Sequence, residues 1–492
     1  MTHDGITKAD RADVVVVGAG AAGLYAALVA AREGAQVALV SRSPLAESAS
    51  YWAQGGIAAA LAEDDSPELH LEDTLKAGRG ATRESAARVL CEDAPARVHD
   101  LQQLGVRFDA DRNGALALGL EGGHSRRRVA HAGGSATGRR ITRDLSALAA
   151  LHPLIDVLEL TTARALWVDE GRCVGVLAEP AQGAPRPLLA RAVVLATGGA
   201  AALWQRTTNP RGATGVGMTL AHAVGAKLAD VEFMQFHPTA LVRPGERHDG
   251  FLITEAIRGE GATLITAHGE RFVNELAPRD EVALAIEQRL REGDTVLIDM
   301  RDIDLARFPN IVSALEAAGF DPGSEPVPVA PAAHYTMGGV ATDLNGRSSL
   351  PGLYAVGECG CTGLHGANRL ASNSLAECFV FGYRAARAAL DEPEPPANDP
   401  SPPETGPAAI PSVETRRALW RLAGLERDAA GLTRLLGDPF PLARLIAHSA
   451  LEREESRGAH QRSDRPETDP ALDEKHLLVG DENGSAEWEV WG

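Results

Sequence analysis

Cysteine is scarce in this sequence, which has five cysteines among 492 residues. A small, odd number in so long a chain argues against the disulfide framework of a secreted domain, so we expect reduced thiols and a cytoplasmic protein. Cys359 and Cys361 form the one close pair, and a metal site would need a second pair at a suitable spacing. We therefore expect no metal ion.

Positive charge is also in short supply. Lys and Arg number 48 against 67 Asp and Glu, which gives a formal net charge of −19. An excess of negative charge argues against nucleic acid or an anionic membrane as the main partner. The polar N-terminus has no apolar core of the kind that marks a secretory signal. An anionic substrate stays possible, because a local basic pocket can lie within an acidic protein.

Only one uncharged run, residues 14–31, reaches the length of a membrane span. Glycines stand at positions 18, 20 and 23, and the apolar residue type changes there from valine to alanine and leucine. This change favours a buried strand, a tight turn and a buried helix over a single membrane-spanning helix. We therefore expect no membrane partner.

The glycines of this run form a motif. Residues 18–23 read GAGAAG, which fits G-x-G-x-x-G directly after an expected strand and at the start of an expected helix. Such a turn lets the backbone approach a pyrophosphate, and the helix N-terminus offers N–H groups to the phosphates. The alternative is a glycine turn that only packs. The predicted binding residues are Gly18, Ala19, Gly20, Ala21, Ala22 and Gly23.

Three further segments favour FAD over NAD. The second expected strand ends in Ser41-Arg42, not in the acidic residue that usually holds a ribose. Residues 47–56 (ESASYWAQGG) can run close to a phosphate and an isoalloxazine ring, and Glu358 can bind a ribose hydroxyl. A helix that starts near residue 372 can direct N–H groups at flavin oxygens. The cofactor residues predicted from these segments are Arg42, Ser48, Ala49, Ser50, Gln54, Gly55, Gly56, Glu358, Ser374 and Leu375.

The pattern along the chain predicts an α/β fold with a discontinuous Rossmann-like FAD-binding domain, an inserted α+β capping domain and a C-terminal helical domain. Apolar strands are expected at residues 13–17, 36–40, 192–196 and 353–356. Helical periodicity spans residues 413–436 and 441–457, and the residues from about 462 are expected to be irregular. The expected parts are the FAD-binding domain over 1–230 and 336–391, the capping domain over 231–335, a Pro-rich linker over 392–411, and the helical domain and tail over 412–492.

Eight motifs together resemble the L-aspartate oxidases, within the succinate dehydrogenase and fumarate reductase flavoprotein family. The resemblance covers residues 12–458. The motifs occur in the family's order and read GAGAAG, YWAQGGIAAA, EGGHSRRRVAH, EFMQFHPTAL, FLITEAIRGEGA, ELAPRDEVA, PAAHYTMGGV and GLHGANRLASNSLAE. The loop that carries a flavin-linked histidine in many relatives reads ESASYW here, so the resemblance implies non-covalent FAD.

The resemblance also implies which residues form the substrate site. His237, Thr254, His334 and Arg369 match the positions that bind a four-carbon dicarboxylate. Arg279 matches the family's proton-transfer arginine, with Glu255 and Arg258 handing protons to and from it. Glu255 and Arg258 are three residues apart, so on a helix they share a face, and a surface ion pair is the alternative for these two.

Glu121 stands where succinate and fumarate enzymes usually carry glutamine. A carboxylate would repel a plain dicarboxylate, but it complements a substrate that also carries an α-ammonium group. We expect Glu121 to accept that ammonium and to help orient Cα–H toward flavin N5, selecting an amino-dicarboxylate over succinate. The alternative is a glutamate that caps a helix or lies at the rim of the site.

The implied reaction is oxidation of L-aspartate to iminoaspartate by FAD, the first step toward quinolinate and NAD. Reduced flavin would be reoxidised by O₂, giving H₂O₂, or by fumarate, giving succinate. A functional link to quinolinate synthase is implied by the resemblance alone. The alternatives are a soluble fumarate reductase and a flavin-binding scaffold without catalysis. The last is suggested by two departures from the family, a short loop over residues 271–277 and Val216 in place of an aspartate that helps hold FAD.

Overall fold

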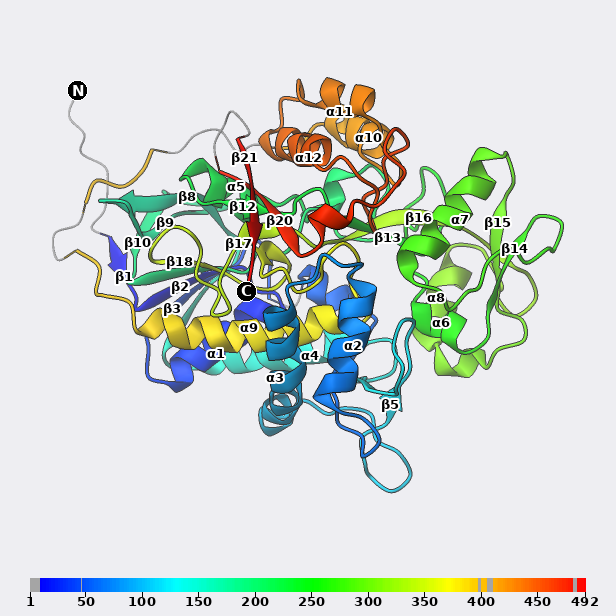
Figure 1. Cartoon of the computed structure of the whole chain (residues 1–492). Helices are drawn as coiled ribbons and strands as arrows, with labels where there is room; N and C mark the ends of the chain where they lie inside the picture. The colour runs from blue at the N-terminus through cyan, green and yellow to red at the C-terminus, as the bar shows by residue number, and fades with distance from the viewer. Residues whose placement is uncertain (1–8, 46, 397–399, 405–409, 481–484) are drawn as a thin grey trace.

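The centre of the protein is a five-stranded parallel sheet with the order β18-β11-β2-β3-β7. The computed structural model describes residues 9–45, 47–396, 400–404, 410–480 and 485–492. The strands come from distant parts of the chain, as Figure 1 shows, which confirms the discontinuous α/β domain expected from the sequence. They are β2 (Val14–Val17), β3 (Val37–Val40), β7 (Ile155–Leu158), β11 (Ala192–Leu195) and β18 (Leu353–Ala355).

The central strands are apolar throughout because both faces of the sheet are covered. One face, with Val14, Val16 and Leu39, packs against four helices, and the other, with Val15 and Val17, packs against a mixed sheet and the C-terminal helices. The four helices are α1 (Ala21–Arg32), α3 (Glu84–Gln103), α4 (Thr137–Leu151) and α9 (Asn373–Leu390). The mixed sheet consists of β1 (Asp10–Arg11), β8 (Thr161–Asp169), β9 (Arg172–Pro180) and β10 (Arg186–Leu189), and only β1 and β10 pair in parallel.

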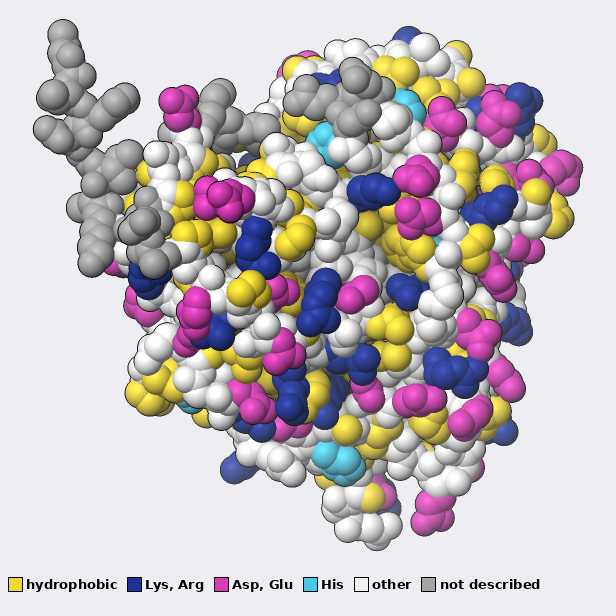
Figure 2. All heavy atoms as spheres, turned by 60° about the vertical axis from the view of Figure 1, so that its left-hand side comes forward, with side chains coloured by type: hydrophobic (Ala, Val, Ile, Leu, Met, Phe, Trp, Pro, Cys, Tyr) yellow, Lys and Arg dark blue, Asp and Glu magenta, His cyan; other side chains and the backbone are white. Residues whose placement is uncertain are grey.

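The apolar run of residues 14–31 divides into β2, a glycine turn and the 12-residue helix α1. In the part of the chain that the structure describes, no helix combines the length and hydropathy that a membrane span requires. Acidic and basic side chains are interspersed over the face shown in Figure 2, together with apolar ones.

Residues 234–336 build a second lobe, which lies on the right of Figure 1. Its sheet has the order β13-β16-β15-β14, and its own core includes Ile253, Leu264 and Ile286. The predicted borders of this capping domain, 231 and 335, stay a prediction. The strands are β13 (Met234–Leu241), β14 (Thr263–Thr266), β15 (Val296–Asp299) and β16 (Val327–Thr336), and the helices are α6 (Glu255–Gly259), α7 (Arg279–Arg291) and α8 (Pro309–Ala317).

Short elements complete the fold. A small sheet has the order β4-β6-β5, α2 packs against α3, and α5 packs against β8. These elements are β4 (Ile57–Ala58), β5 (Leu118–Gly119), β6 (Val129–Ala130), α2 (Pro67–Ala77) and α5 (Val216–Ala223).

Three short helices follow the proline-rich segment, α10 (Val413–Leu422), α11 (Ala429–Leu435) and α12 (Pro441–Glu452). The periodicity over residues 413–436 is divided between α10 and α11, because Asp428 caps a new helix by accepting the N–H of Gly431 at 2.6 Å. Residues 393–396 and 400–404 of the expected linker lie in no helix or strand, while its residues 397–399 and 405–409 lie outside the described residues.

The expectation of an irregular tail is wrong for residues 475–479 and 486–490, while residues 481–484 lie outside the described residues. Strands β20 (Lys475–Val479) and β21 (Ala486–Val490) close a sheet of the order β19-β17-β12-β20-β21. The composition misled because two of the five residues of β21 are glutamates and none of the five is buried, while β20 buries its apolar residues against the rest of the fold. The remaining strands are β12 (Leu228–Ala229), β17 (Gly339–Ala341) and β19 (Gly360–Cys361).

Candidate active site

A cavity of about 900 Å³ lies where the carboxyl ends of the central strands meet the second lobe. Open parallel sheets bind their ligands at this edge. The cavity is lined by every site residue predicted from the sequence except Gly23 and Arg258, so segments from residue 18 to residue 375 converge on one space.

The glycine turn forms one end of this cavity. Gly18 has a φ of 114°, and a Cβ there would lie 2.3 Å from the carbonyl oxygen of Ala196. Gly23 does not line the cavity, because it lies where α1 packs on the turn; a Cβ on Gly23 would lie 1.8 Å from the carbonyl oxygen of Gly18. Both glycines are therefore required for the backbone to take this path, and the remaining residues of the motif face the cavity.

Buried polar atoms along the cavity suit a polar cofactor. The Oγ of Ser48 and the Oε1 of Gln54 are buried and make no hydrogen bond within the described part of the protein. A buried polar atom without a partner is costly, so a ligand that bonds to these atoms would be stabilised. Ser374 and Leu375, at the start of α9, line the same space. The residues present therefore fit FAD, whose phosphates, ribose hydroxyls and pyrimidine oxygens need such partners.

Two charged residues expected to contact the cofactor also reach the cavity. The Nη2 of Arg42 donates to the carbonyl oxygen of Gly212 at 3.2 Å, and the Oε1 of Glu358 accepts the N–H of Thr336 at 2.9 Å. Burial raises the pKa of Glu358 to about 7. Each side chain is thus held by one backbone group while it still lines the cavity.

At the other end of the cavity, the amide of Gln235 joins Arg279 to Arg369. Its Oε1 accepts from the Nη1 of Arg279 at 3.1 Å and from the Nε and Nη2 of Arg369 at 3.3 and 3.2 Å. The guanidinium of Arg369 lies 4.4 Å from the ring centre of Tyr335 and donates to the Oγ of Ser374 at 2.8 Å. Burial, with the nearby charge of Arg279, lowers the pKa of Arg369 to about 10, so Arg369 is still a cation at neutral pH.

The start of α6 carries both Thr254 and Glu255 into the site. Glu255 accepts from the Nε of Arg279 at 2.6 Å and lies 3.4 Å from the Nη2 of Arg258. Burial raises the pKa of Glu255, but the charges of Arg279 and Arg258 outweigh it and hold that pKa below its ordinary value. Arg258 is buried behind Glu255 and donates to the carbonyl oxygen of Glu275. The alternative of a surface ion pair is therefore wrong for Glu255 and Arg258.

Two neutral histidines line the cavity beside the arginines. The rings of His237 and His334 lie 5.1 Å apart, centre to centre. Burial, reinforced by the charge of Arg279, lowers the pKa of both rings well below 6.5. The Nδ1 of His237 accepts the N–H of Thr239 at 3.3 Å, so the neutral ring carries its proton on Nε2 and can donate it. The Nδ1 of His334 lies 2.8 Å from the Oγ1 of Thr208.

Glu121 is a buried carboxylate on the wall of the same cavity, with 5% of its surface exposed. Its Oε2 accepts a 2.6 Å hydrogen bond from the Oγ of Ser372, which in turn accepts the N–H of Gly56 at 3.1 Å. Its Oε1 makes no hydrogen bond within the described residues and lies 3.8 Å from the Nε2 of His131. One carboxylate oxygen is thus fixed by the protein, and the other has no hydrogen-bond partner within the described residues.

Two carboxylates, those of Asp65 and Asp73, fix the segment that carries Glu121. Arg128 is fully buried and pairs with Asp65 at 2.9 Å and with Asp73 at 2.6 Å. Asp73 also accepts the backbone N–H of Ser125 at 2.8 Å. Arg128, one of the three arginines that follow Glu121 in the sequence, therefore has a structural role. The sequence alone did not indicate a function for it.

The two departures from the family pattern lie close to the site. Val216 is the first residue of α5 and lines the cavity. In the short loop over residues 271–277, Arg271 pairs with Glu275 at 2.7 Å, and Glu275 accepts the N–H of Leu264 at 3.0 Å. The loop is thus tied to β14 as well as to Arg258.

Sequence reasoning missed Gln235 and Ser372, each of which holds a predicted site residue. Gln235 precedes His237 by two positions on β13, and residues two apart in a strand point to the same face. That spacing could have indicated Gln235. Ser372 has a φ of 61°, a conformation that nothing in its residue type signals.

Comparisons with known proteins agree with this geometry. Residues 13–375 match the family model described as "FAD binding domain", and residues 427–490 match the one described as "Fumarate reductase flavoprotein C-term". The chain is 47% identical to an L-aspartate oxidase of Caulobacter vibrioides, over 93% of this chain and 94% of that protein. It is 42% identical to an L-aspartate oxidase of Streptomyces coelicolor, over 95% of this chain and 91% of that protein.

Solved structures show the same fold. The E. coli quinol fumarate reductase FrdA superimposes with a TM-score of 0.88 at 31% identity, covering 98% of this chain and 97% of that one. The Mycobacterium smegmatis Sdh1 superimposes with a TM-score of 0.83 at 31% identity, covering 98% and 94%. The chain therefore belongs to the L-aspartate oxidase family of FAD-binding flavoproteins, within the succinate dehydrogenase and fumarate reductase group.

Proposed function

We propose that this protein oxidises L-aspartate to iminoaspartate with non-covalently bound FAD. The observation that carries the proposal is the buried carboxylate of Glu121, which lines a cavity that also holds Arg279 and Arg369 and whose Oε1 has no hydrogen-bond partner within the described residues. A cavity with arginines alone would suit any dicarboxylate. The added carboxylate complements the α-ammonium group of an amino-dicarboxylate.

Each polar group has a proposed role. Arg369, His237, His334 and Thr254 bind the two substrate carboxylates, since a guanidinium fork and neutral N–H and O–H donors match carboxylate oxygens. Glu121 accepts the α-ammonium and orients Cα–H. As hydride leaves Cα, the α-ammonium also loses one proton; Arg279 is the proton-transfer group for this proton, and Glu255 and Arg258 pass protons to and from Arg279. When bound, FAD supplies the two-electron acceptor that takes hydride from Cα and is reoxidised by O₂, giving H₂O₂, or by fumarate, giving succinate.

The cofactor would be held by the glycine turn, by the segment that contains Ser48, Ser50 and Gln54, and by the start of α9. We infer non-covalent binding because residues 44–52 contain no histidine. Denaturing the holoprotein with acid should therefore release all of its flavin into the supernatant. Flavin that stays with the precipitated protein would contradict this part of the proposal.

Fumarate reduction is the second candidate, because the arginine and histidine set suits any four-carbon dicarboxylate. We propose further that the product passes to quinolinate synthase, as the resemblance implies, and that the protein is cytoplasmic, as its few cysteines indicate. The test is turnover of L-aspartate with O₂ or fumarate as acceptor, measured as H₂O₂ or succinate formed per ammonium released after hydrolysis of the imine. Turnover of succinate or fumarate without any turnover of L-aspartate would favour the second candidate.

A further inference from the structure

The turn formed by the last residue of α2 and the three residues after it, 77–80, lies outside the cavity but meets three segments that surround it. Two consecutive residues of the turn adopt left-handed backbone conformations, Arg79 with a φ of 57° and Gly80 with a φ of 77°. A non-glycine residue with positive φ is uncommon and persists where its surroundings fix it. The contacts of Arg79 show what fixes it here.

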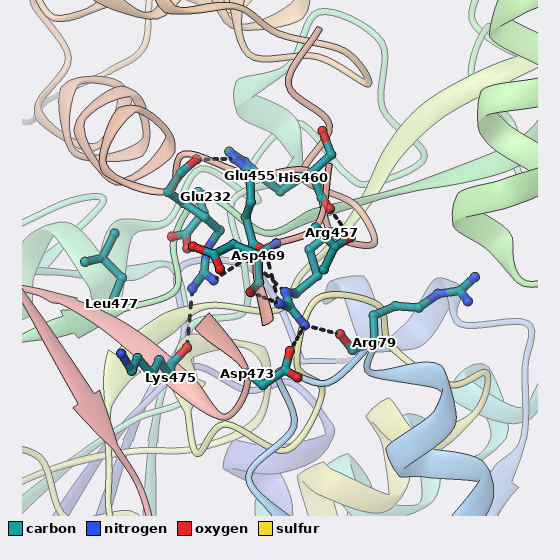
Figure 3. Close-up of polar contacts among 12 residues, drawn as sticks. Arg79, Glu232, Glu455, Arg457, His460, Asp469, Asp473, Lys475 and Leu477 are labelled. Carbon is teal, nitrogen blue, oxygen red and sulfur yellow. Dashed lines mark hydrogen bonds and ion pairs between the residues drawn. The ribbon is translucent and has the colours of Figure 1, made fainter. Parts of the chain in front are cut away.

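The backbone of Arg79 is held by the C-terminal part of the chain. The Nη1 of Arg457 donates to the carbonyl oxygen of Arg79 at 2.6 Å, and a Cβ on Gly80 would lie 2.8 Å from the same nitrogen. Arg457 is itself buried and fixed by Glu455 at 2.8 Å and by Asp473 at 2.7 Å. Figure 3 shows Arg457 reaching the carbonyl of Arg79, while the side chain of Arg79 points away from this cluster.

The side chain of Arg79 binds the first turn of α7, in the second lobe. Its Nε and Nη2 donate to both carboxylate oxygens of Asp280 at 2.9 and 3.1 Å, and its Nη2 also donates to Glu281 at 2.6 Å. The side chain of Asp280 is only 6% exposed. A bidentate hydrogen-bonded ion pair of this kind fixes the orientation of the two side chains as well as the distance between them.

Asp280 follows Arg279 directly, so the contact with Arg79 fixes the backbone that carries the proposed proton-transfer group. The guanidinium of Arg279 depends on two short contacts, at 2.6 Å to Glu255 and at 3.1 Å to Gln235. A small shift of the first turn of α7 would lengthen both contacts.

The same turn also holds the segment that carries Arg369. The carbonyl oxygen of Ala77 accepts from the Nδ2 of Asn368 at 3.2 Å, and the Oδ1 of Asn368 accepts from the Nε2 of Gln235 at 3.0 Å. Residues 77–80 therefore contact the neighbours of both arginines that Gln235 joins.

We propose that Arg79 is a positioning residue. From outside the cavity it fixes the position of Arg279 by binding the carboxylate of Asp280. This inference rests on the proposed function only for the role of Arg279. The contact spans the FAD-binding part and the second lobe, so it also fixes the lobe at the edge of the cavity. A surface ion pair without this role would leave turnover unchanged when broken.

The test compares Arg79→Gln, Arg79→Lys, Asp280→Asn and the double variant Arg79→Gln with Asp280→Asn in the FAD-loaded protein. Arg88→Gln is the matched control, because Arg88 pairs with Glu84 within α3. Arg79→Gln should lower kcat for L-aspartate about tenfold or more, with KM within about threefold, since a misplaced catalytic group costs rate more than binding. The kcat of Arg79→Lys should lie between those of the unaltered protein and Arg79→Gln, because an ammonium group cannot bind both oxygens of Asp280 in the same bidentate way. The kcat of the double variant should be no lower than that of the slower of the two single variants, Arg79→Gln and Asp280→Asn, because both substitutions remove the same contact.

A kcat for Arg79→Gln within about twofold of that of Arg88→Gln would overturn the proposal. If the unaltered protein does not oxidise L-aspartate, the proposed function fails, and hydrogen exchange decides the positioning claim on its own. Exchange of the amides of residues 279–291 should then be at least about fivefold faster in Arg79→Gln than in Arg88→Gln. Equal exchange in the two variants would overturn the inference.

Discussion

Ser372 donates a 2.6 Å hydrogen bond to Glu121, across 251 positions of sequence. The hydroxyl of Ser372 is also the acceptor for the N–H of Gly56, so its one proton is directed at the carboxylate. This arrangement keeps one oxygen of Glu121 in place, while the other has no hydrogen-bond partner within the described residues. The selectivity proposed for the site depends on that second oxygen.

Glu121→Gln should reduce kcat/KM for L-aspartate by at least about a hundredfold, because a buried amide cannot neutralise the substrate ammonium. The dissociation constant of succinate, measured from the perturbed flavin spectrum, should stay the same or fall, since a repulsive charge is removed. Glu72→Gln, on the exposed face of α2, is the control. An equal loss for aspartate and succinate would contradict the role given to Glu121.

Gln235→Glu should raise KM for L-aspartate about tenfold or more. A carboxylate at this position would pair with Arg279 and Arg369 and cancel part of the positive charge that the substrate carboxylates require. Gln103→Glu, at the exposed end of α3, adds the same charge away from the site. Steady-state kinetics at fixed O₂ give the comparison, and an unchanged KM in Gln235→Glu would mean that the charge of the pair does not hold substrate.

Val216→Asp should tighten FAD binding about threefold or more, because a carboxylate on the cavity wall can accept a hydrogen bond from a ribose hydroxyl or a flavin N–H. Val413→Asp is a matched control, since Val413 is also the first residue of a helix but is exposed far from the cavity. Titration of the apoprotein with FAD, followed by quenching of flavin fluorescence, measures the difference. Weaker binding in Val216→Asp would show that the departure at this position is adapted to the rest of the site.

The protein should lose stability as the pH falls from 7 to 5. Burial lowers the pKa of His70 to about 3, and His237, His334 and His460 are also held well below 6.5. Below pH 6.5 the unfolded chain binds protons that the folded protein excludes, so the free energy of unfolding falls. His70 alone should account for about 2 kcal/mol at pH 5. Between pH 7 and 5, the free energy of unfolding measured in urea should therefore fall less in His70→Gln than in the unaltered protein, by that amount. An identical pH dependence in the two proteins would contradict the low pKa of His70.

Much of the central fold could be predicted because the residue types themselves indicate whether a position is buried or lies in a tight turn. The all-valine strand at residues 14–17, the glycine turn after it and the buried helix admit few other structures. The tail could not be predicted in the same way. His476 in β20 pairs with Asp230 at 2.5 Å, a partner 246 positions away that local composition does not reveal.

The site was predictable to the extent that its residues lie in motifs. The arginines, the histidines and Glu121 lie in such segments, and the structure brings them to one cavity. The groups that hold them, Gln235, Ser372 and Arg79, gain their roles from distant contacts. Arg128 shows the same limit, since a run of three arginines does not indicate which one is buried between two aspartates.

The most direct test of the central claim is anaerobic reduction of the FAD-loaded protein by L-aspartate, followed at the flavin absorbance near about 450 nm. We expect L-aspartate to bleach this band, succinate to leave it unchanged, and air to restore it with formation of H₂O₂. An unchanged spectrum with FAD demonstrably bound, or bleaching by succinate alone, would contradict the claim that this cavity oxidises an amino-dicarboxylate.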